Sequence, residues 1–152
     1  MVIEVTERKE KSRIARRVLE ALTDWFGIAE SREKYILDSE EWQMFASFNE
    51  KGDADGFICL KETGKDTAEI AVVGVLREHH RQGIGRELFR KAREAAKEKG
   101  YSFLQVKTVQ MGRYEEYDDT NRFYQSLGFK EFEVIPDLWD ENNPCQIYVM
   151  AL

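Results

Sequence analysis

The feature that most constrains this chain is a strand, a glycine-containing turn and a helix in direct succession. An apolar run at residues 70–76, rich in β-branched side chains, predicts a buried strand. A polar loop follows, and Gly83 and Gly85 then open a helix. The first N–H groups of a helix lack partners within it, and its dipole adds about half a positive charge there. Because glycine has no Cβ, a ligand can approach such a backbone closely, and Arg81 and Arg86 add formal charge. The pattern is typical of a site for an anion such as pyrophosphate.

Length and composition limit the classes of protein to consider. The chain has 152 residues, 42% of them hydrophobic and 34% charged, which fits a single soluble domain over residues 1–152. The net charge of −6 disfavours a nucleic-acid partner, and no apolar run approaches the roughly 20 residues of a membrane span. Cys59 and Cys145 match no metal-ligand spacing, so we expect buried free thiols, no metal site and, without a secretory signal pattern, a cytoplasmic location.

The order of predicted elements indicates the fold class. Strands are expected at residues 2–6, 42–49, 55–62, 67–76, 101–109, 129–135 and 146–152. Helices are expected at residues 9–25, around 35–37, from Gly83 to Lys97, and from Asp118 or Asp119 to Leu127, and a loop is expected at residues 136–144. A right-handed crossover makes the strand after the third helix parallel to the one before it. The prediction is an α/β protein with one mixed, mostly antiparallel sheet and helices on both faces, in the order β-α-α-β-β-β-α-β-α-β-β.

The glycine turn can be compared with known motifs. No Lys-Ser/Thr pair follows the glycines, as a Walker loop requires, and no third glycine completes a dinucleotide fingerprint. The segment from His80 to Gly85 resembles motif A of the GNAT superfamily of acetyltransferases, R/Q-x-x-G-x-G/A, with His in place of Arg or Gln. Downstream, Tyr124, Gly128 and Phe129 match the Tyr-x-x-x-Gly-Phe signature that is common at a helix end in the same family. The two motifs lie in the expected order, and the resemblance extends over nearly the whole chain.

The resemblance implies binding of acetyl-CoA and assigns its contacts. A β-bulge in the strand before the turn is expected to separate it from its parallel neighbour, and we place that bulge at Gly74. The N–H of Gly74 or Val75 would polarise the thioester carbonyl. Many relatives carry an Asn seven residues before the tyrosine; here that position is Tyr117, so Asn121, one turn later on the same helix face, is expected to substitute. The expected cofactor contacts are Val73, Gly74, Val75, Arg81, Gln82, Gly83, Ile84, Gly85, Arg86, Asn121 and Tyr124.

The implied reaction is transfer of acetyl to an amine by direct attack in a ternary complex. Tyr124 is the expected general acid for the coenzyme A thiolate; the alternative is an aromatic residue that only closes the core. Glu69 is the expected general base, acting through water; the alternative is a salt-bridged strand residue. His79 and His80 are expected to serve local hydrogen bonding. Helical spacing places Thr120, Phe123 and Leu127 on the inward stripe of their helix.

The acceptor site in this fold is built by the first two helices and by the loops after the fifth and sixth strands. Those loops are acidic and aromatic, which suits a small cationic amine such as a polyamine or an aminoglycoside-like molecule. The expected substrate contacts are Trp25, Phe26, Tyr117 and Trp139. A non-catalytic acyl-CoA-binding module and a protein N-terminal or lysine acetyltransferase remain as alternatives. Apolar residues of the last strand, Ile147, Val149 and Met150, suggest a homodimer, and no nucleic acid or membrane is expected as a partner.

Overall fold

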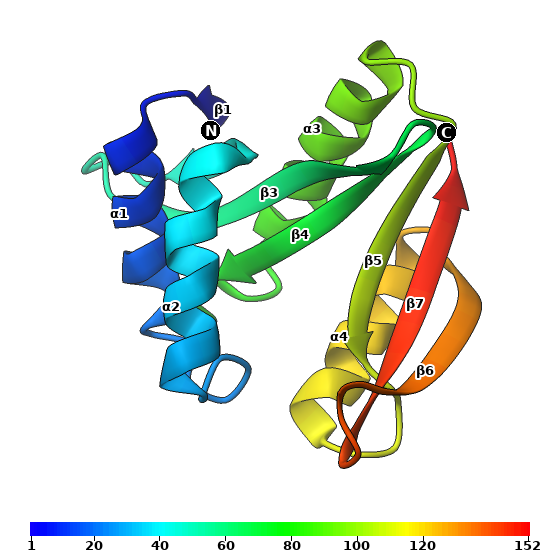
Figure 1. Cartoon of the computed structure of the whole chain (residues 1–152). Coiled ribbons are helices and arrows are strands. Elements are labelled where there is room, and N and C mark those ends of the chain that lie inside the picture. The colour runs from blue at the N-terminus through cyan, green and yellow to red at the C-terminus, as the bar shows by residue number, and fades with distance from the viewer.

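The computed structural model describes residues 1–152 and contains one seven-stranded sheet in the order β1-β2-β3-β4-β5-β7-β6 (Figure 1). Its elements are β1 (Val2–Val5), α1 (Arg8–Leu19), α2 (Ala29–Asp38), the 3₁₀ helix η1 (Ser39–Glu41), β2 (Gln43–Phe48), β3 (Ala54–Gly64), β4 (Thr67–Val75), the 3₁₀ helix η2 (Arg77–His79), α3 (Ile84–Glu98), β5 (Phe103–Val109), α4 (Glu115–Ser126), β6 (Lys130–Asp140) and β7 (Asn143–Ala151). Only β4 and β5 pair in parallel. The predicted order of elements and the mixed, mostly antiparallel sheet are confirmed.

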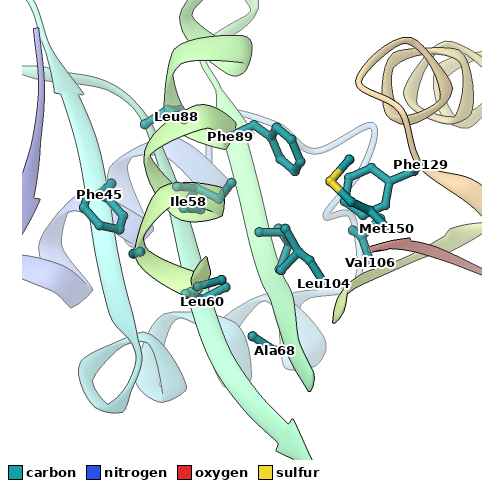
Figure 2. Close-up of a cluster of buried hydrophobic side chains, with 14 of the residues drawn as sticks. Phe45, Ile58, Leu60, Ala68, Leu88, Phe89, Leu104, Val106, Phe129 and Met150 are labelled. Atoms are coloured by element: carbon teal, nitrogen blue, oxygen red, sulfur yellow. The ribbon is translucent and has the colours of Figure 1, made fainter. Parts of the chain in front are cut away.

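Helices cover both faces of the sheet, each over its own apolar core. On one face, α3 contributes Leu88 and Phe89 to a cluster that reaches Phe129 and Met150 in the other half of the sheet (Figure 2). On the opposite face, α1 and α2 bury a second cluster that includes Leu19 and Ile36. Each fully buried side chain of this size contributes roughly 1.5–3 kcal/mol relative to an exposed one. The helices therefore fix the two faces of the strands that carry the site.

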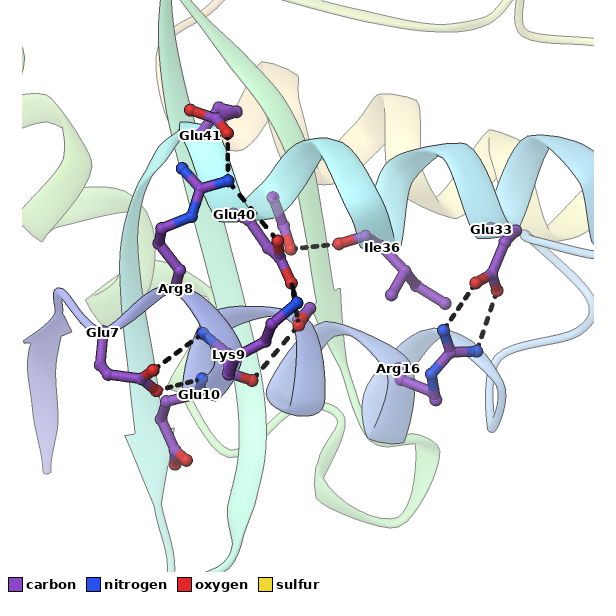
Figure 3. Close-up of polar contacts among 11 residues, drawn as sticks. Glu7, Arg8, Lys9, Glu10, Arg16, Glu33, Ile36, Glu40 and Glu41 are labelled. Carbon is purple, nitrogen blue, oxygen red and sulfur yellow. Dashed lines mark hydrogen bonds and ion pairs between the residues drawn. The ribbon is translucent and has the colours of Figure 1, made fainter.

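The first helical layer is held by polar contacts (Figure 3). Glu7 caps α1, since its carboxylate accepts from the N–H groups of Lys9 at 3.2 Å and Glu10 at 2.6 Å. Arg16 on α1 donates to both carboxylate oxygens of Glu33 on α2, at 2.9 and 2.6 Å. This bidentate pair aligns the two helices before the chain enters β2.

The first helix is shorter than the apolar periodicity predicts. It ends at Leu19, and residues 20–28 form hydrogen-bonded turns in which the N–H groups of Trp25 and Phe26 both reach the Leu22 carbonyl. Thr23 and Asp24 are weak helix formers, and Asp24 forms an ion pair with Arg77 beyond β4. The apolar residues after Leu19 therefore lie on a loop.

The C-terminal part of the chain also departs from prediction. The expected loop at residues 136–144 is wrong, because β6 continues to Asp140 and β7 begins at Asn143. The Asp140 carboxylate accepts from the Asn142 N–H at 2.8 Å and from Asn143 Nδ2 at 2.9 Å, which closes a tight turn. The fourth helix begins at Glu115 rather than Asp118 or Asp119. Asp118 instead accepts from the Gly112 N–H at 2.7 Å and so holds the loop before the helix.

The position of β7 bears on the expected homodimer. This strand lies between β5 and β6, so both of its backbone edges are already paired. Ile147 and Met150 are buried within the chain. Ile147 and Met150 are therefore used in the core of this chain, and the homodimer stays a prediction.

Candidate active site

A gap opens between the two central strands. β4 and β5 pair only over Thr67–Ile70 and Phe103–Val106. Beyond these pairs the strands diverge, as Figure 1 shows, because β4 continues against β3 while β5 continues against β7. Residues 71–75 of β4 therefore present one backbone edge to the gap with no strand partner. Such an edge can hydrogen-bond an extended ligand as an added strand would. We call this feature the β4–β5 gap.

A β-bulge lies where the gap begins. Cys59 pairs with Val72 and Leu60 pairs with Ile70, so Ala71 is an extra residue on β4. The expected bulge is present, but its placement at Gly74 is wrong, since Gly74 pairs regularly with Phe57. A Cβ at Gly74 would lie 3.0 Å from a Val18 methyl and 3.2 Å from a Leu22 methyl. The close packing of α1 and the turn after it therefore favours a glycine there.

The turn at residues 81–86, the anion-binding turn, has the unpaired donors that the sequence predicts. No protein acceptor receives the backbone N–H of any of these residues. Gly83 is the N-cap of α3 with φ of 83°, and Arg81 is in the left-handed region with φ of 66°. Such a conformation costs about 1–3 kcal/mol for a residue with a Cβ and recurs at ligand sites. Left-handed residues among unpaired N–H groups form a concave anion-binding backbone.

The two glycines of the turn have different roles. A Cβ built at Gly83 would meet nothing within 4 Å, so this face of the turn is open. A Cβ at Gly85 would lie 3.1 Å from Cζ of Phe123, so this glycine admits the α4 ring against α3. Arg86 also joins the two helices, donating to the Ser126 hydroxyl at 2.9 Å. The anion-binding turn is thus attached to α4 on one side and open on the other.

The histidines in front of the turn serve local hydrogen bonding, as expected. Nε2 of His80 lies 2.7 Å from the Val75 carbonyl oxygen, which connects the turn to the end of β4. Nδ1 of His79 lies 3.3 Å from the Gln82 side-chain oxygen. The residue that departs from the family motif therefore stabilises the geometry of the turn through its side chain.

Tyr124 has a hydroxyl with no hydrogen-bond partner in the protein. Its side chain belongs to the core, yet no protein group hydrogen-bonds to the hydroxyl, which keeps contact with solvent. Burial raises the pKa of Tyr124, and the nearby Tyr35 and Tyr117 raise it further. The phenol therefore stays protonated at neutral pH and can donate a proton or a hydrogen bond to a bound group.

Asn121 does not have the position expected of a cofactor contact. Its side chain is fully buried, and Nδ2 donates to the carbonyls of Val109 at 2.9 Å and Tyr117 at 2.7 Å. Its oxygen accepts from the Tyr148 hydroxyl at 2.6 Å. The geometry instead ties α4 to β5 and β7. The expected inward stripe is confirmed only in part: Phe123 and Leu127 pack partly buried against the core, but the buried α4 residues are Asn121 and Tyr124.

Glu69 is paired with a lysine that the sequence did not single out. Its carboxylate lies 2.7 Å from Nζ of Lys107, with side-chain exposures of 8% and 26%. Lys107 follows Val106, the last β5 residue that pairs with β4, so the ion pair lies at the closed end of the β4–β5 gap. The signal that could have found it is a single lysine in the otherwise mostly apolar strand from Phe103 to Val109.

Tyr35 of α2 is a second residue that sequence reasoning missed. Burial raises its pKa, with further contributions from the nearby Glu69 and Cys145. No protein group hydrogen-bonds to its hydroxyl in this structure. Burial also raises the pKa of Cys145 to about 11, so its thiol is neutral. Tyr35 of α2 therefore lies near Glu69 of β4 and Cys145 of β7, and the signal in sequence was one tyrosine in a mostly polar helix.

Three of the four expected substrate residues come together at the α1–α2 loop. Trp25 Nε1 donates to the Glu116 carbonyl at 3.2 Å, and the Tyr117 hydroxyl donates to the Trp25 carbonyl at 2.6 Å. We call this pair of bonds the Trp25–Tyr117 clasp. The Phe26 ring packs edge-on against Tyr35 at 6.0 Å. Trp139 lies apart on β6, 44% exposed, and no ring contact or hydrogen bond joins it to the others.

The fold and this geometry agree with the comparisons with known proteins. Among solved structures, a Desulfovibrio desulfuricans protein described as a GNAT-family acetyltransferase matches with a TM-score of 0.85 and 18% identity over 99% of both chains. The Escherichia coli ribosomal-protein-S18-alanine N-acetyltransferase matches with a TM-score of 0.77 and 17% identity, over 99% of this chain and 94% of that one. An aminoglycoside 6'-N-acetyltransferase solved with coenzyme A matches with a TM-score of 0.72 and 18% identity, over 99% and 96%.

Identities this low show the fold alone, and a search of curated protein sequences finds no match. A family model gives the assignment. The model described as the acetyltransferase (GNAT) domain matches residues 40–131, more than half of the chain. The matched segment contains the bulge, the β4–β5 gap, the anion-binding turn and Tyr124. The chain therefore belongs to the GNAT family of N-acetyltransferases.

Proposed function

We propose that the protein transfers the acetyl group of acetyl-CoA to a primary amine of a small cationic molecule. The observation that carries the proposal is the β4–β5 gap, which has the anion-binding turn at its open end and the Tyr124 hydroxyl beside it. The unpaired N–H groups of residues 81–86 fit a pyrophosphate, and the free edge of residues 71–75 fits the amides of a pantetheine arm. Acetyl-CoA is the acetyl donor that has both groups.

The residues around the gap can carry the steps of the transfer. An alkylamine with a pKa of about 10.4 is almost fully protonated at neutral pH, so it must lose a proton before it attacks. Glu69, which is paired with Lys107 at the closed end of the gap, can accept that proton through water. A backbone N–H of β4 polarises the thioester carbonyl. Tyr124 donates its proton to the departing thiolate.

Two observations support a small acceptor that carries positive charge. The Trp25–Tyr117 clasp joins the α1–α2 loop to α4, which favours a pocket over an open groove. Several carboxylates of α4 and of the β6–β7 hairpin have no partner within the chain, whereas Asp118, Asp119 and Asp140 are used in local contacts. The carboxylates without a hydrogen bond or ion pair are those of Glu115, Glu116, Asp137 and Glu141. An acidic rim with exposed aromatic residues attracts an organic cation.

A protein N-terminus is the second candidate acceptor. It is favoured by the fold match to the ribosomal-protein-S18-alanine N-acetyltransferase over nearly the full length of both chains. The aminoglycoside acetyltransferase matches over a similar length, so the fold does not decide between the two. The Trp25–Tyr117 clasp, which joins the α1–α2 loop to α4, is the feature that weighs against an open groove for a polypeptide.

The test is a panel of acceptors scored by release of free coenzyme A thiol from acetyl-CoA. The panel contains polyamines, aminoglycosides and short peptides with free N-termini, and Tyr124→Phe is the matched control variant. The proposal expects fastest release with a polycationic small molecule. Release with peptides alone would replace it with the second candidate. Calorimetric binding of coenzyme A without release for any amine would show a binding module instead of an enzyme.

The proposal has no place for a membrane. None of the helices is long and apolar enough to cross a bilayer. The two cysteines are buried and unpaired, which is usual for a reducing compartment. The cytoplasmic location and the homodimer stay predictions that fractionation and light scattering can test.

A further inference from the structure

Lys107 is an amine built into the reaction site. If the parallel register of β4 and β5 continued, Lys107 would lie opposite Ala71, the bulged residue at which the gap begins. Its side chain is 26% exposed, and its Nζ lies 2.7 Å from a carboxylate oxygen of Glu69. The lysine is therefore held in one place by a largely buried partner, and part of its side chain stays exposed.

The expected course of the cofactor leads to this lysine. The anion-binding turn follows the last residue of β4, so the phosphate end of a ligand lies beyond Val75. From Val75 back to Ala71 are four residue steps, which at about 3.3 Å each span about 13 Å of strand. A pantetheine arm that follows the free edge of β4 from the turn therefore brings its thioester toward the closed end of the gap. Lys107 stands at that end.

We propose that Lys107 is itself an acetyl acceptor, which the enzyme acetylates when no amine substrate is bound. The inference rests on the proposed function. A general base must lie within hydrogen-bond reach of the proton it removes, directly or through one water. The Nζ of Lys107 already lies in that relation to Glu69. The amine of Lys107 therefore occupies the position, beside Glu69, that the ammonium group of a free acceptor would take.

The step balances without any other reactant. Glu69 takes one proton from the Lys107 ammonium, and the nitrogen lone pair forms a bond to the thioester carbonyl carbon. The carbon–sulfur bond breaks, and the electron pair leaves with the sulfur. Tyr124 supplies the proton that makes the free thiol, the acylated nitrogen loses its second proton to the Tyr124 phenolate, and Glu69 releases its proton to solvent. The products are an amide at Lys107 and coenzyme A.

The modification would change the charge of the site. An acetylated Lys107 has no positive charge, so the Glu69 carboxylate loses its only ion-pair partner. A largely buried carboxylate without a counter-charge is unfavourable. The ammonium group of a cationic acceptor can supply that charge. Self-acetylation of Lys107 would therefore leave Glu69 free to form an ion pair with the substrate.

The first test follows the order in which lysines are modified. The protein is incubated with acetyl-CoA and no amine, and acetylation is mapped residue by residue over time by mass spectrometry. Chemical acetylation by free thioester should follow exposure and reach Lys34 and Lys9, with side chains 77% and 75% exposed, before Lys107. A templated reaction reverses this order, and Lys107 is modified first. Modification in the order of exposure, or none at Lys107, overturns the proposal.

Variants separate templated transfer from background reaction. Glu69→Gln keeps the shape of the side chain but removes the proton acceptor, and should slow acetylation of Lys107 at least tenfold while leaving Lys34 unchanged. Equal rates at Lys107 in both proteins count against the proposal. Lys107→Arg keeps the ion pair and removes the acceptor, so any acetylation that persists reports only the exposed lysines.

A second test does not depend on enzymatic transfer. Acetic anhydride labels the lysines of the protein with and without coenzyme A. Bound coenzyme A should protect Lys107 at least fivefold and leave Lys34 unaffected, and equal labelling of Lys107 overturns its placement at the thioester end. If amine turnover is observed but Lys107 is neither protected nor acetylated, this inference fails while the proposed function stands. If coenzyme A does not bind, both fail.

Discussion

Removing the Tyr124 hydroxyl tests the chemistry with little disturbance of the fold. Tyr124→Phe keeps the ring that packs against Phe129 and Tyr148. The lost hydroxyl has no hydrogen-bond partner in the protein, so no buried group is left unsatisfied, and the melting temperature should change little. A general acid contributes about 10²–10⁴-fold to kcat, or about 2.7–5.4 kcal/mol at 1.36 kcal/mol per tenfold. KM for acetyl-CoA should hardly move, because the proton is transferred only in the transition state.

Tyr148→Phe is the matched control for this prediction. The Tyr148 hydroxyl is buried, donates to Asn121 at 2.6 Å and accepts from Gln125 at 3.2 Å. Its removal leaves the Asn121 oxygen without a donor, which costs about 1–3 kcal/mol. For a chain of this length each kcal/mol lowers the melting temperature by about 2–4 °C. Tyr124→Phe should therefore lose kcat with little change in melting temperature, whereas Tyr148→Phe should lose stability.

The assays are thiol release at saturating acetyl-CoA and amine, and thermal unfolding followed by circular dichroism. Wild-type kcat in Tyr124→Phe would remove Tyr124 as the acid. The free hydroxyl of Tyr35 would then be the next candidate, examined as Tyr35→Phe. A loss of kcat in Tyr148→Phe as large as that in Tyr124→Phe would show that both losses come from a shift of α4 rather than from the loss of a proton donor.

Three further predictions concern the base, the turn and alkaline pH. Glu69→Gln should lower kcat/KM at neutral pH and recover as the pH approaches the amine pKa of about 10.4; a pH-independent loss in the rate profile would contradict the base role. Gly83→Val strains a residue with φ of 83° and fills the open face of the turn, so calorimetry should show coenzyme A affinity at least tenfold weaker, about 1.4 kcal/mol. Gly85→Val should instead press on Phe123 and lower the melting temperature; unchanged affinity in both variants would refute the turn assignment. Burial raises the pKa of Tyr117 to about 12 and also raises that of Tyr124, whereas unfolded tyrosines titrate near pH 10. The protonated phenols therefore stabilise the fold fully below about pH 10, and melts between about pH 9 and 12 should show that stability lost as the pH rises.

The features that the sequence predicts correctly depend on neighbours along the chain. Gly83, at φ of 83°, is set by the backbone of one short segment, and such segments have recognisable residue patterns. The features that were wrong depend on packing between distant segments. A glycine inside a strand is typical of a β-bulge, yet the bulge lies at Ala71 and not at Gly74. The glycine at position 74 is explained only by the side chains of the first helical layer that pack against it. Helical periodicity continues to Trp25, yet the chain leaves the helix after Leu19 to reach α4.

The same distinction explains why the reaction site was predicted only in part. Tyr124 was found because it lies in a motif with Gly128 and Phe129. Tyr35 and Lys107 lie in segments with no motif, and they reach the site because β4 and β5 separate just after Ile70 and Val106. Side chains next to the β4–β5 gap are brought together by the separation of the two strands and not by a sequence motif. Their identities can therefore vary while the motifs of the fold stay the same. We therefore expect the residues that determine the acceptor to be those that the gap brings together, and Tyr35 and Lys107 to be the first to examine.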